Sequence, residues 1–148
     1  MKLKQIVLSI ENSPDRLYEV TSALGEAGIN LRALNLVDTG EFGQLRLLVS
    51  DVTTARRILM EMHMPAFITE VVATEIPDVP KSLANLLKLL KDGGVHPTSM
   101  YAFHGGASHG QAVMIFRFSD NDRAIEILKE KGVKILDSEA FGILESGK

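Results

Sequence analysis

The sequence predicts an α+β fold built from two βαββαβ units in tandem, each an antiparallel sheet with helices on one face. Three observations support this fold class: the 148-residue chain repeats itself, strand-like and helix-like periodicities alternate within each copy, and no linker rich in proline, glycine or serine separates the copies. The composition is that of a globular protein, with 45% hydrophobic and 24% charged residues. We therefore expect the whole repeat to fold.

The repeat is visible as matched residues at a nearly constant spacing. The matched pairs are Pro14 and Pro80, Gly28 and Gly94, Ser50 and Ser119, and Asp51 and Asp120. The first two pairs are 66 residues apart and the last two are 69 apart, so the second copy has three additional residues between these markers. We place them in the glycine-rich stretch 104–110. The copies are expected to form two domains, residues 1–70 and 71–148.

The first copy alternates strand and helix patterns. Residues 3–10 are rich in aliphatic and β-branched side chains, as a strand requires. An apolar stripe at helical spacing follows over residues 14–27, with Pro14 suited to the first turn and Gly28 to the position after the helix. Residues 30–39 and 44–50 read as a strand pair, and Asp51 or Thr53 can cap the next helix. This order is β, α, β, β, α.

The second copy follows the same pattern. Its expected elements are strand 71–76, helix 81–92, strands 95–103 and 111–118, helix 121–131 and strand 133–138. The last strand of the first copy, residues 65–70, and the first strand of the second, residues 71–76, follow without a break. We predict one long strand that both copies share.

Charge and composition exclude several functional classes. The net charge of −3 argues against a nucleic-acid partner, because such proteins gather Lys and Arg against phosphates. The absence of cysteine removes disulfides and thiolate chemistry and is typical of a cytoplasmic protein. No apolar run approaches the roughly 20 residues of a membrane helix, and residues 1–10 lack the apolar core of a signal peptide. We expect no membrane partner.

Two short motifs resemble the signatures of the ACT domain, and the resemblance covers nearly the whole chain. The first copy carries Glu-Asn-Ser-Pro-Asp-Arg-Leu at residues 11–17 and Glu-Ala-Gly-Ile-Asn-Leu at residues 26–31. The second carries Pro-Asp-Val-Pro-Lys-Ser-Leu at residues 77–83 and Gly-Gly-Val-His at residues 93–96. Asp15 and Lys81 stand where the family usually has glycine. The resemblance implies a ferredoxin-like fold for each unit.

The resemblance also implies a function: a regulatory protein that binds a free amino acid, or a related small carboxylate, at ACT domain interfaces and modulates an enzyme of amino-acid metabolism. A homodimer is expected, because pairing would cover the remaining apolar faces. The residues that the family's motifs imply as ligand-binding are Asn12, Ser13, Asp15, Arg16, Gly28, Ile29, Asn30, Asp78, Lys81 and His96. Asparagine side chains both donate and accept hydrogen bonds, which suits a zwitterion. No cofactor is implied.

Structural roles remain open for the same residues. Asn12 and Asn30 are also common turn residues, and a side chain at Asp15 or Lys81 occupies space that a ligand would need. A ligand-free interaction module is therefore the alternative function. A third option is an enzyme on the same fold, for which the sequence shows no nucleophile–base pair or acid pair; we expect no catalysis. His104 and His109 in the glycine-rich stretch permit a metal site only with a third ligand such as His96.

Overall fold

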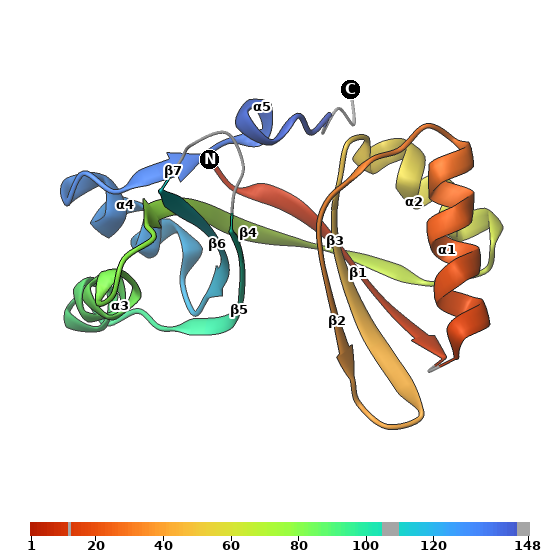
Figure 1. The fold of residues 1–148 in the computed structure, drawn as a ribbon, viewed down its shortest axis with the longest axis horizontal. Helices are drawn as coiled ribbons and strands as arrows, with labels where there is room; N and C mark the ends of the chain where they lie inside the picture. Colours follow the sequence, from red (N-terminus) through yellow and green to blue (C-terminus); the bar gives the residue numbers. More distant parts are fainter. Residues whose placement is uncertain (12, 105–109, 145–148) are drawn as a thin grey trace. The chain divides into compact units, whose positions relative to one another are not determined.

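The computed structural model describes residues 1–11, 13–104 and 110–144 (Figure 1). The elements are β1 (Leu3–Glu11), α1 (Pro14–Glu26), β2 (Leu31–Asp38), β3 (Phe42–Val49), α2 (Val52–Glu61), β4 (Ala66–Pro77), α3 (Ser82–Asp92), β5 (Pro97–His104), β6 (Gln111–Phe118), α4 (Asn121–Glu130), β7 (Lys134–Leu136) and α5 (Ser138–Phe141). The predicted βαββαβ order therefore occurs twice. β4 is the predicted long strand, and it serves both copies.

The chain forms two compact units, which we call the first and second modules. The first module contains residues 4–69 together with the chain from Ser138 onward. The second contains residues 1–3 and 70–137. The division between them falls inside β4, and the C-terminal segment belongs to the module that the N-terminal half of the chain builds.

The sheet of the first module has the order β2-β3-β1-β4, and α1 and α2 lie together on one of its faces (Figure 1). β3 pairs antiparallel with both of its neighbours, placing Leu47 opposite Ile6 and Leu45 opposite Leu8. Because side chains alternate along a strand, these residues all face the helices. They pack with Val20 and Leu24 of α1 and with other buried side chains of α2, and all of these core residues are fully buried or nearly so.

The two longer helices of the first module, α1 and α2, each begin at a side-chain cap. The Ser13 hydroxyl accepts a hydrogen bond from the Arg16 amide at 3.3 Å, and Pro14 occupies the first helical position, where its missing N–H costs nothing. Asp51 caps α2 by accepting from the Thr54 amide at 3.1 Å and the Thr54 hydroxyl at 2.7 Å. These bonds lower the pKa of Asp51, so the cap is a carboxylate. Of the two predicted caps for α2, Asp51 is the one used.

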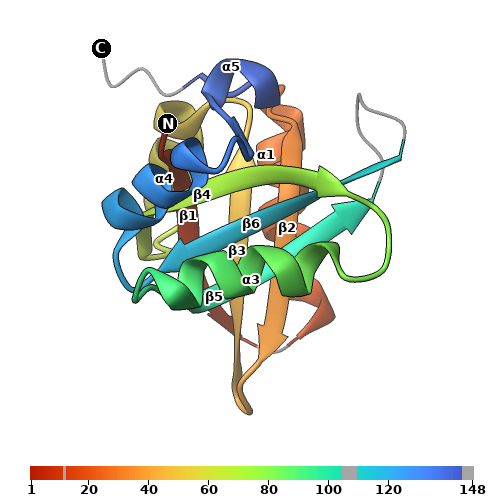
Figure 2. The same cartoon turned by 90° about the vertical axis from the view of Figure 1, so that its left-hand side faces the viewer.

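The second module repeats this architecture, with α3 and α4 side by side over β5 and β6 (Figure 2). Its strand order is β5-β6-β4, with β7 on the other edge of β4. Phe116 fills the centre of the core and stacks on Phe118 with ring centroids 4.7 Å apart. Gly93 leaves room for the Ile127 side chain, which would have to shift if residue 93 had a Cβ. Two antiparallel modules with helices on one face confirm the predicted fold class.

The C-terminal segment adds a feature that the sequence did not indicate. After β7 the chain forms the short helix α5 and then runs beside the start of α2 in the first module. The Leu144 amide donates to Ser50 O at 2.7 Å, and the Val52 amide donates to Leu144 O at 3.0 Å. Ile143 is buried, and the Arg32 guanidinium donates to Gly142 O at 3.2 Å. This segment is therefore part of the first module's packing.

Across residues 1–11, 13–104 and 110–144, no helix has the length and apolar character needed to cross a membrane.

Candidate functional site

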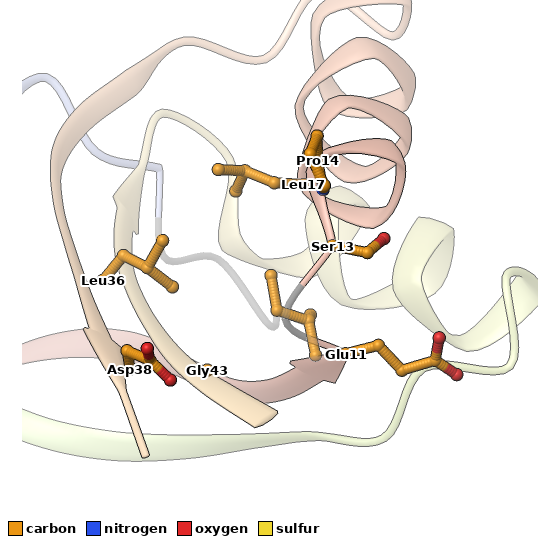
Figure 3. Close-up of a pocket in the computed structure, with 8 residues that line it drawn as sticks. Glu11, Ser13, Pro14, Leu17, Leu36, Asp38 and Gly43 are labelled. Carbon is orange, nitrogen blue, oxygen red and sulfur yellow. The ribbon is translucent and has the colours of Figure 1, made fainter. Parts of the chain in front are cut away.

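A cavity of about 220 Å³ opens in the first module beside the start of α1 (Figure 3). It is lined by Ile10, Glu11, Ser13, Pro14, Leu17, Leu36, Asp38 and Gly43. These residues come from the end of β1, the first turn of α1, the end of β2 and the beginning of β3. Four residues of the motif, Glu11, Ser13, Pro14 and Leu17, therefore form one wall of the cavity.

Strand register brings the remaining residues of this cavity to the motif. In the antiparallel pairings, Gly43 of β3 lies opposite Ile10 of β1 and also opposite Asp38 of β2. A Cβ on Gly43 would lie 3.0 Å from the Leu36 side chain. Glycine at this position therefore leaves the space between β1 and β2 open.

The first turn of α1 supplies the polar end of the cavity. The Ser13 amide donates to Glu11 O at 2.7 Å, which fixes the chain as it leaves β1. Pro14 has no N–H and the Arg16 N–H is used by the Ser13 hydroxyl. The positive end of the α1 dipole nevertheless lies at this wall, and such helix starts favour negatively charged groups.

Asp38 makes the opposite end of the cavity acidic, and the middle of the cavity is apolar. Asp38 lies beside Gly43, and its carboxylate accepts from the Gly40 amide at 2.9 Å. Glu11 is the second carboxylate of the lining, and its side chain extends away from Asp38 (Figure 3). Leu17 and Leu36 point toward each other across the space. Among the residues that the structure describes, no lysine or arginine lines the cavity, so the charge of the lining favours a cationic group.

The structure divides the residues predicted for the first module between the two ends of α1. Ser13, Asp15 and Arg16 lie at its start, whereas Asn30 follows its end; a 13-residue helix spans about 20 Å. Ser13 lines the cavity, and Arg16 instead pairs with Glu19 at 3.0 Å. Asp15 is an exposed residue of the first helical turn. Asn12 lies outside the described residues, so its predicted role stays a prediction.

Gly28, Ile29 and Asn30 form the turn between α1 and β2. Gly28 adopts φ +78°, and Ile29 is buried. The Asn30 backbone forms two hydrogen bonds with Ser50: its amide donates to the Ser50 hydroxyl at 2.8 Å, and its carbonyl accepts from the Ser50 amide at 2.9 Å. These bonds hold the start of β2 against the end of β3 and do not use the Asn30 side chain.

The predicted residues of the second module are divided in the same way. Asp78 and Lys81 precede α3, while His96 follows it. The Asp78 amide donates to Gly110 O at 2.8 Å, and Lys81 adopts φ +79°. The His96 amide donates to the Ser119 hydroxyl at 3.2 Å, which repeats the bond between Asn30 and Ser50.

The two modules differ in the chemistry of the cavity positions. By the repeat spacing, Pro77 stands at the position of Glu11, and Val79 at that of Ser13. The position of Asp38 corresponds to His104. The second module therefore has no carboxylate at the positions that make the cavity of the first module acidic.

Sequence reasoning missed most of the cavity lining outside the motif. Leu36, Asp38 and Gly43 were assigned only to a strand pair and its turn. The signal that could have found them is the turn at residues 40–43: closing it brings residues 36–38 and 43 beside the end of β1. The metal alternative falls partly on His109, outside the described residues, and the described chain contains no cluster of three His, Asp or Glu suited to a metal ion.

The sequence matches a family model described as an ACT domain pair over residues 1–144. The chain belongs to the ACT domain pair family. A crystal structure of protein BT0572 from Bacteroides thetaiotaomicron is 39% identical and has a TM-score of 0.90, over 97% of this chain and 98% of that one. None of the curated proteins matches significantly.

More distant structures share the fold of this ACT domain pair. The ligand-free regulatory subunit of aspartate kinase from Thermus thermophilus has a TM-score of 0.60 at 14% identity, over 88% of this chain and 91% of that one. Aspartate kinase from Clostridium acetobutylicum has a TM-score of 0.54 at 14% identity, over 87% of this chain and 32% of that one. The chain is therefore similar in fold to one part of that longer enzyme.

Proposed function

We propose that this ACT domain pair is a regulatory protein that binds a small free amino acid, or a related carboxylate, in the first-module cavity. The observation that carries the proposal is the position of this cavity. It opens on the ACT signature at residues 11–17, and it joins an acidic end, an apolar middle and the start of a helix.

Each part of an amino acid has a complementary group in this cavity. The ammonium is expected near the carboxylate of Asp38, with Glu11 adding negative charge at the rim. The carboxylate is expected at the first turn of α1, where the helix dipole favours an anion. Leu17 and Leu36 lie between these ends and suit an aliphatic side chain. We therefore propose an amino acid of this kind rather than a basic or acidic one.

The size of the cavity supports a small ligand. Its volume of about 220 Å³ is below the roughly 300–1,000 Å³ of sites for drug-sized molecules. Leu36 is 46% exposed, so one side of the space is open to solvent. A bound amino acid would cover Leu36 and gain from removing this surface from water.

Regulation would follow from a shift between conformations. A ligand that binds one arrangement of the chain better than another shifts the equilibrium by no more than the difference in its binding free energies. We propose an enzyme of amino-acid metabolism as the partner and a homodimer as the assembly. The fold that the chain shares with the aspartate kinase regulatory subunit supports such a partner. We propose that the protein is located in the cytoplasm.

A thermal-shift screen against the common amino acids, followed by calorimetric titration of the ligands that respond, tests the proposal. One small aliphatic amino acid is expected to raise the unfolding temperature, because a ligand at 100 times its Kd adds about 2.7 kcal/mol to the free energy of unfolding. Asp38→Asn should weaken its binding about tenfold, and Glu11→Gln should weaken it less.

Glu26→Gln is the matched control, because it removes the same charge at the far end of α1. It should bind like the unmodified protein. If no amino acid raises the unfolding temperature, the sensing function is wrong and the chain acts as an interaction module. If Glu26→Gln weakens binding as much as Asp38→Asn does, binding depends on the net charge of the chain and not on the cavity.

A further inference from the structure

A second concave surface of the first module lies where α2 ends and β4 begins. It has a volume of about 430 Å³ and is lined by Arg56, Arg57, Met60, Met64, Pro65 and Ala66. We call it the arginine groove. We propose that it binds a small organic anion whose carboxylate or phosphate lies between the two guanidinium groups and whose apolar part lies against Met60 and Met64.

Helix geometry explains how two positive charges reach one groove. Met60 lies four residues after Arg56 and three after Arg57, and both spacings make surface neighbours on a helix. The two arginines therefore flank one methionine. Met60 is 72% exposed, and a flexible thioether at such a surface adapts to varied apolar groups.

The groove is positively charged, and its lining includes no acidic residue among those that the structure describes. Arg57 pairs with Glu61 at 2.9 Å, but both side chains are 62% exposed, and exposed pairs of this kind are weak. Within the part of the chain that the structure describes, no hydrogen bond or ion pair engages the Arg56 guanidinium. A planar guanidinium group can donate two parallel hydrogen bonds to two oxygens of one carboxylate or phosphate.

Backbone hydrogen bonds occupy most of the carbonyl oxygens at the end of α2, which reduces their repulsion of an anion. The amides of Met62, His63 and Met64 donate to the carbonyls of Ile58, Met60 and Leu59 at 2.9–3.0 Å. These bonds satisfy three of the last four carbonyl oxygens of the helix. The wall between the helix and β4 is then apolar, formed by Met64, Pro65 and Ala66.

Comparison of the two modules shows that the fold does not require this chemistry. The repeat places Ile125 and Glu126 at the positions of Arg56 and Arg57, and Lys129 at the position of Met60. The second module thus builds the same helix and turn with an apolar residue and a carboxylate. The arginine pair is a property of the first module alone, and it stands in a chain whose net charge is −3.

The groove is separate from the cavity proposed for the amino acid. The cavity is lined by the ends of β1, β2 and β3 and the start of α1, and the two linings share no residue. Their charges are also opposite. The inference therefore does not depend on the proposed function.

The test is a titration of the full chain with each probe, monitored by the backbone amide signals of residues 60–64 and 66 in two-dimensional NMR spectra. The probes are hexanoate, hexyl phosphate, inorganic phosphate and hexanol. Hexanoate or hexyl phosphate should bind saturably with a Kd of about 1 mM, while inorganic phosphate and hexanol should each bind about tenfold more weakly. The better of the two anions identifies the head group.

Arg56→Gln and Arg57→Gln should each weaken binding about tenfold. Arg123→Gln is the matched control, because Arg123 pairs with Glu126 at 3.1 Å on the equivalent helix of the second module. Equal weakening by Arg123→Gln, equal binding of hexanol, or the absence of saturable shifts at residues 60–64 and 66 would overturn the assignment. Because these outcomes involve neither amino acids nor the cavity, they leave the proposed function standing.

Discussion

Lys81 carries a backbone conformation that favours glycine. Its φ of +79° lies in the left-handed region, where a Cβ clashes with the following carbonyl and costs about 1–2 kcal/mol. α3 begins at the next residue, with no side-chain cap. The corresponding residue of the first module, Asp15, is already inside α1, behind the Ser13 cap. The two copies therefore begin their first helices differently, although their motifs align.

This difference predicts opposite effects of one substitution at the two repeat positions. Lys81→Gly should raise the free energy of unfolding by up to about 1 kcal/mol, because it relieves the left-handed strain. Asp15→Gly should lower it by about 1 kcal/mol, because glycine is a poor helix former and the substitution also removes a carboxylate from the first turn. Denaturant unfolding of both variants measures the changes. If both substitutions change the free energy of unfolding in the same direction, the difference in backbone conformation does not affect stability.

For single residues, sequence patterns predicted roles in the backbone better than roles in ligand binding. Pro14, Gly28 and the cap at Asp51 have local signatures and lie where they were expected. The joining of Ser13 with Asp38 and Gly43 in one cavity depends on strand register. That register is set by pairing across the sheet, so no local motif contains it.

Among the elements, the C-terminal segment is the one that periodicity did not indicate. Residues 133–138 were predicted as a strand; β7 covers residues 134–136, and α5 begins at Ser138. The next residues join the first module through Leu144 and the buried Ile143. A segment this short has too few residues for a period. Its position comes from tertiary contacts with the start of α2.

The segment is expected to stabilise the first module through a single buried side chain. Ile143→Ala should lower the free energy of unfolding by about 2 kcal/mol, because it leaves a space beneath the segment. Leu144→Ala is the control, since Leu144 is 54% exposed, and it should change the free energy by less than about 0.5 kcal/mol. Hydrogen exchange of the Val52 amide, which donates to Leu144 O, should accelerate in Ile143→Ala only. Unchanged exchange at Val52 would contradict the stabilising role.

For the whole molecule, the two modules share one fold and differ in surface chemistry. The repeated hydrogen bonds of Asn30 with Ser50 and of His96 with Ser119 hold the same turn in both modules. The fold was therefore predictable, because it depends on apolar periodicity and turn residues that both copies retain. The acidic cavity could not be predicted from the repeat. Glu11 of the first module has Pro77 as its counterpart in the second, so the shared fold does not require a carboxylate at this position.

The central claim is that the first-module cavity, and not its counterpart in the second module, receives the amino acid. Two-dimensional NMR spectra, recorded while the amino acid with the largest thermal stabilisation is added, test this claim most directly. The account predicts saturable shifts centred on the amides of Ser13, Leu17, Leu36 and Gly43, with the same Kd at each and about tenfold weaker binding in Asp38→Asn. Shifts centred instead on the counterparts Val79, Leu83, Ala102 and Ala112, or no saturable shifts in either module, would contradict it.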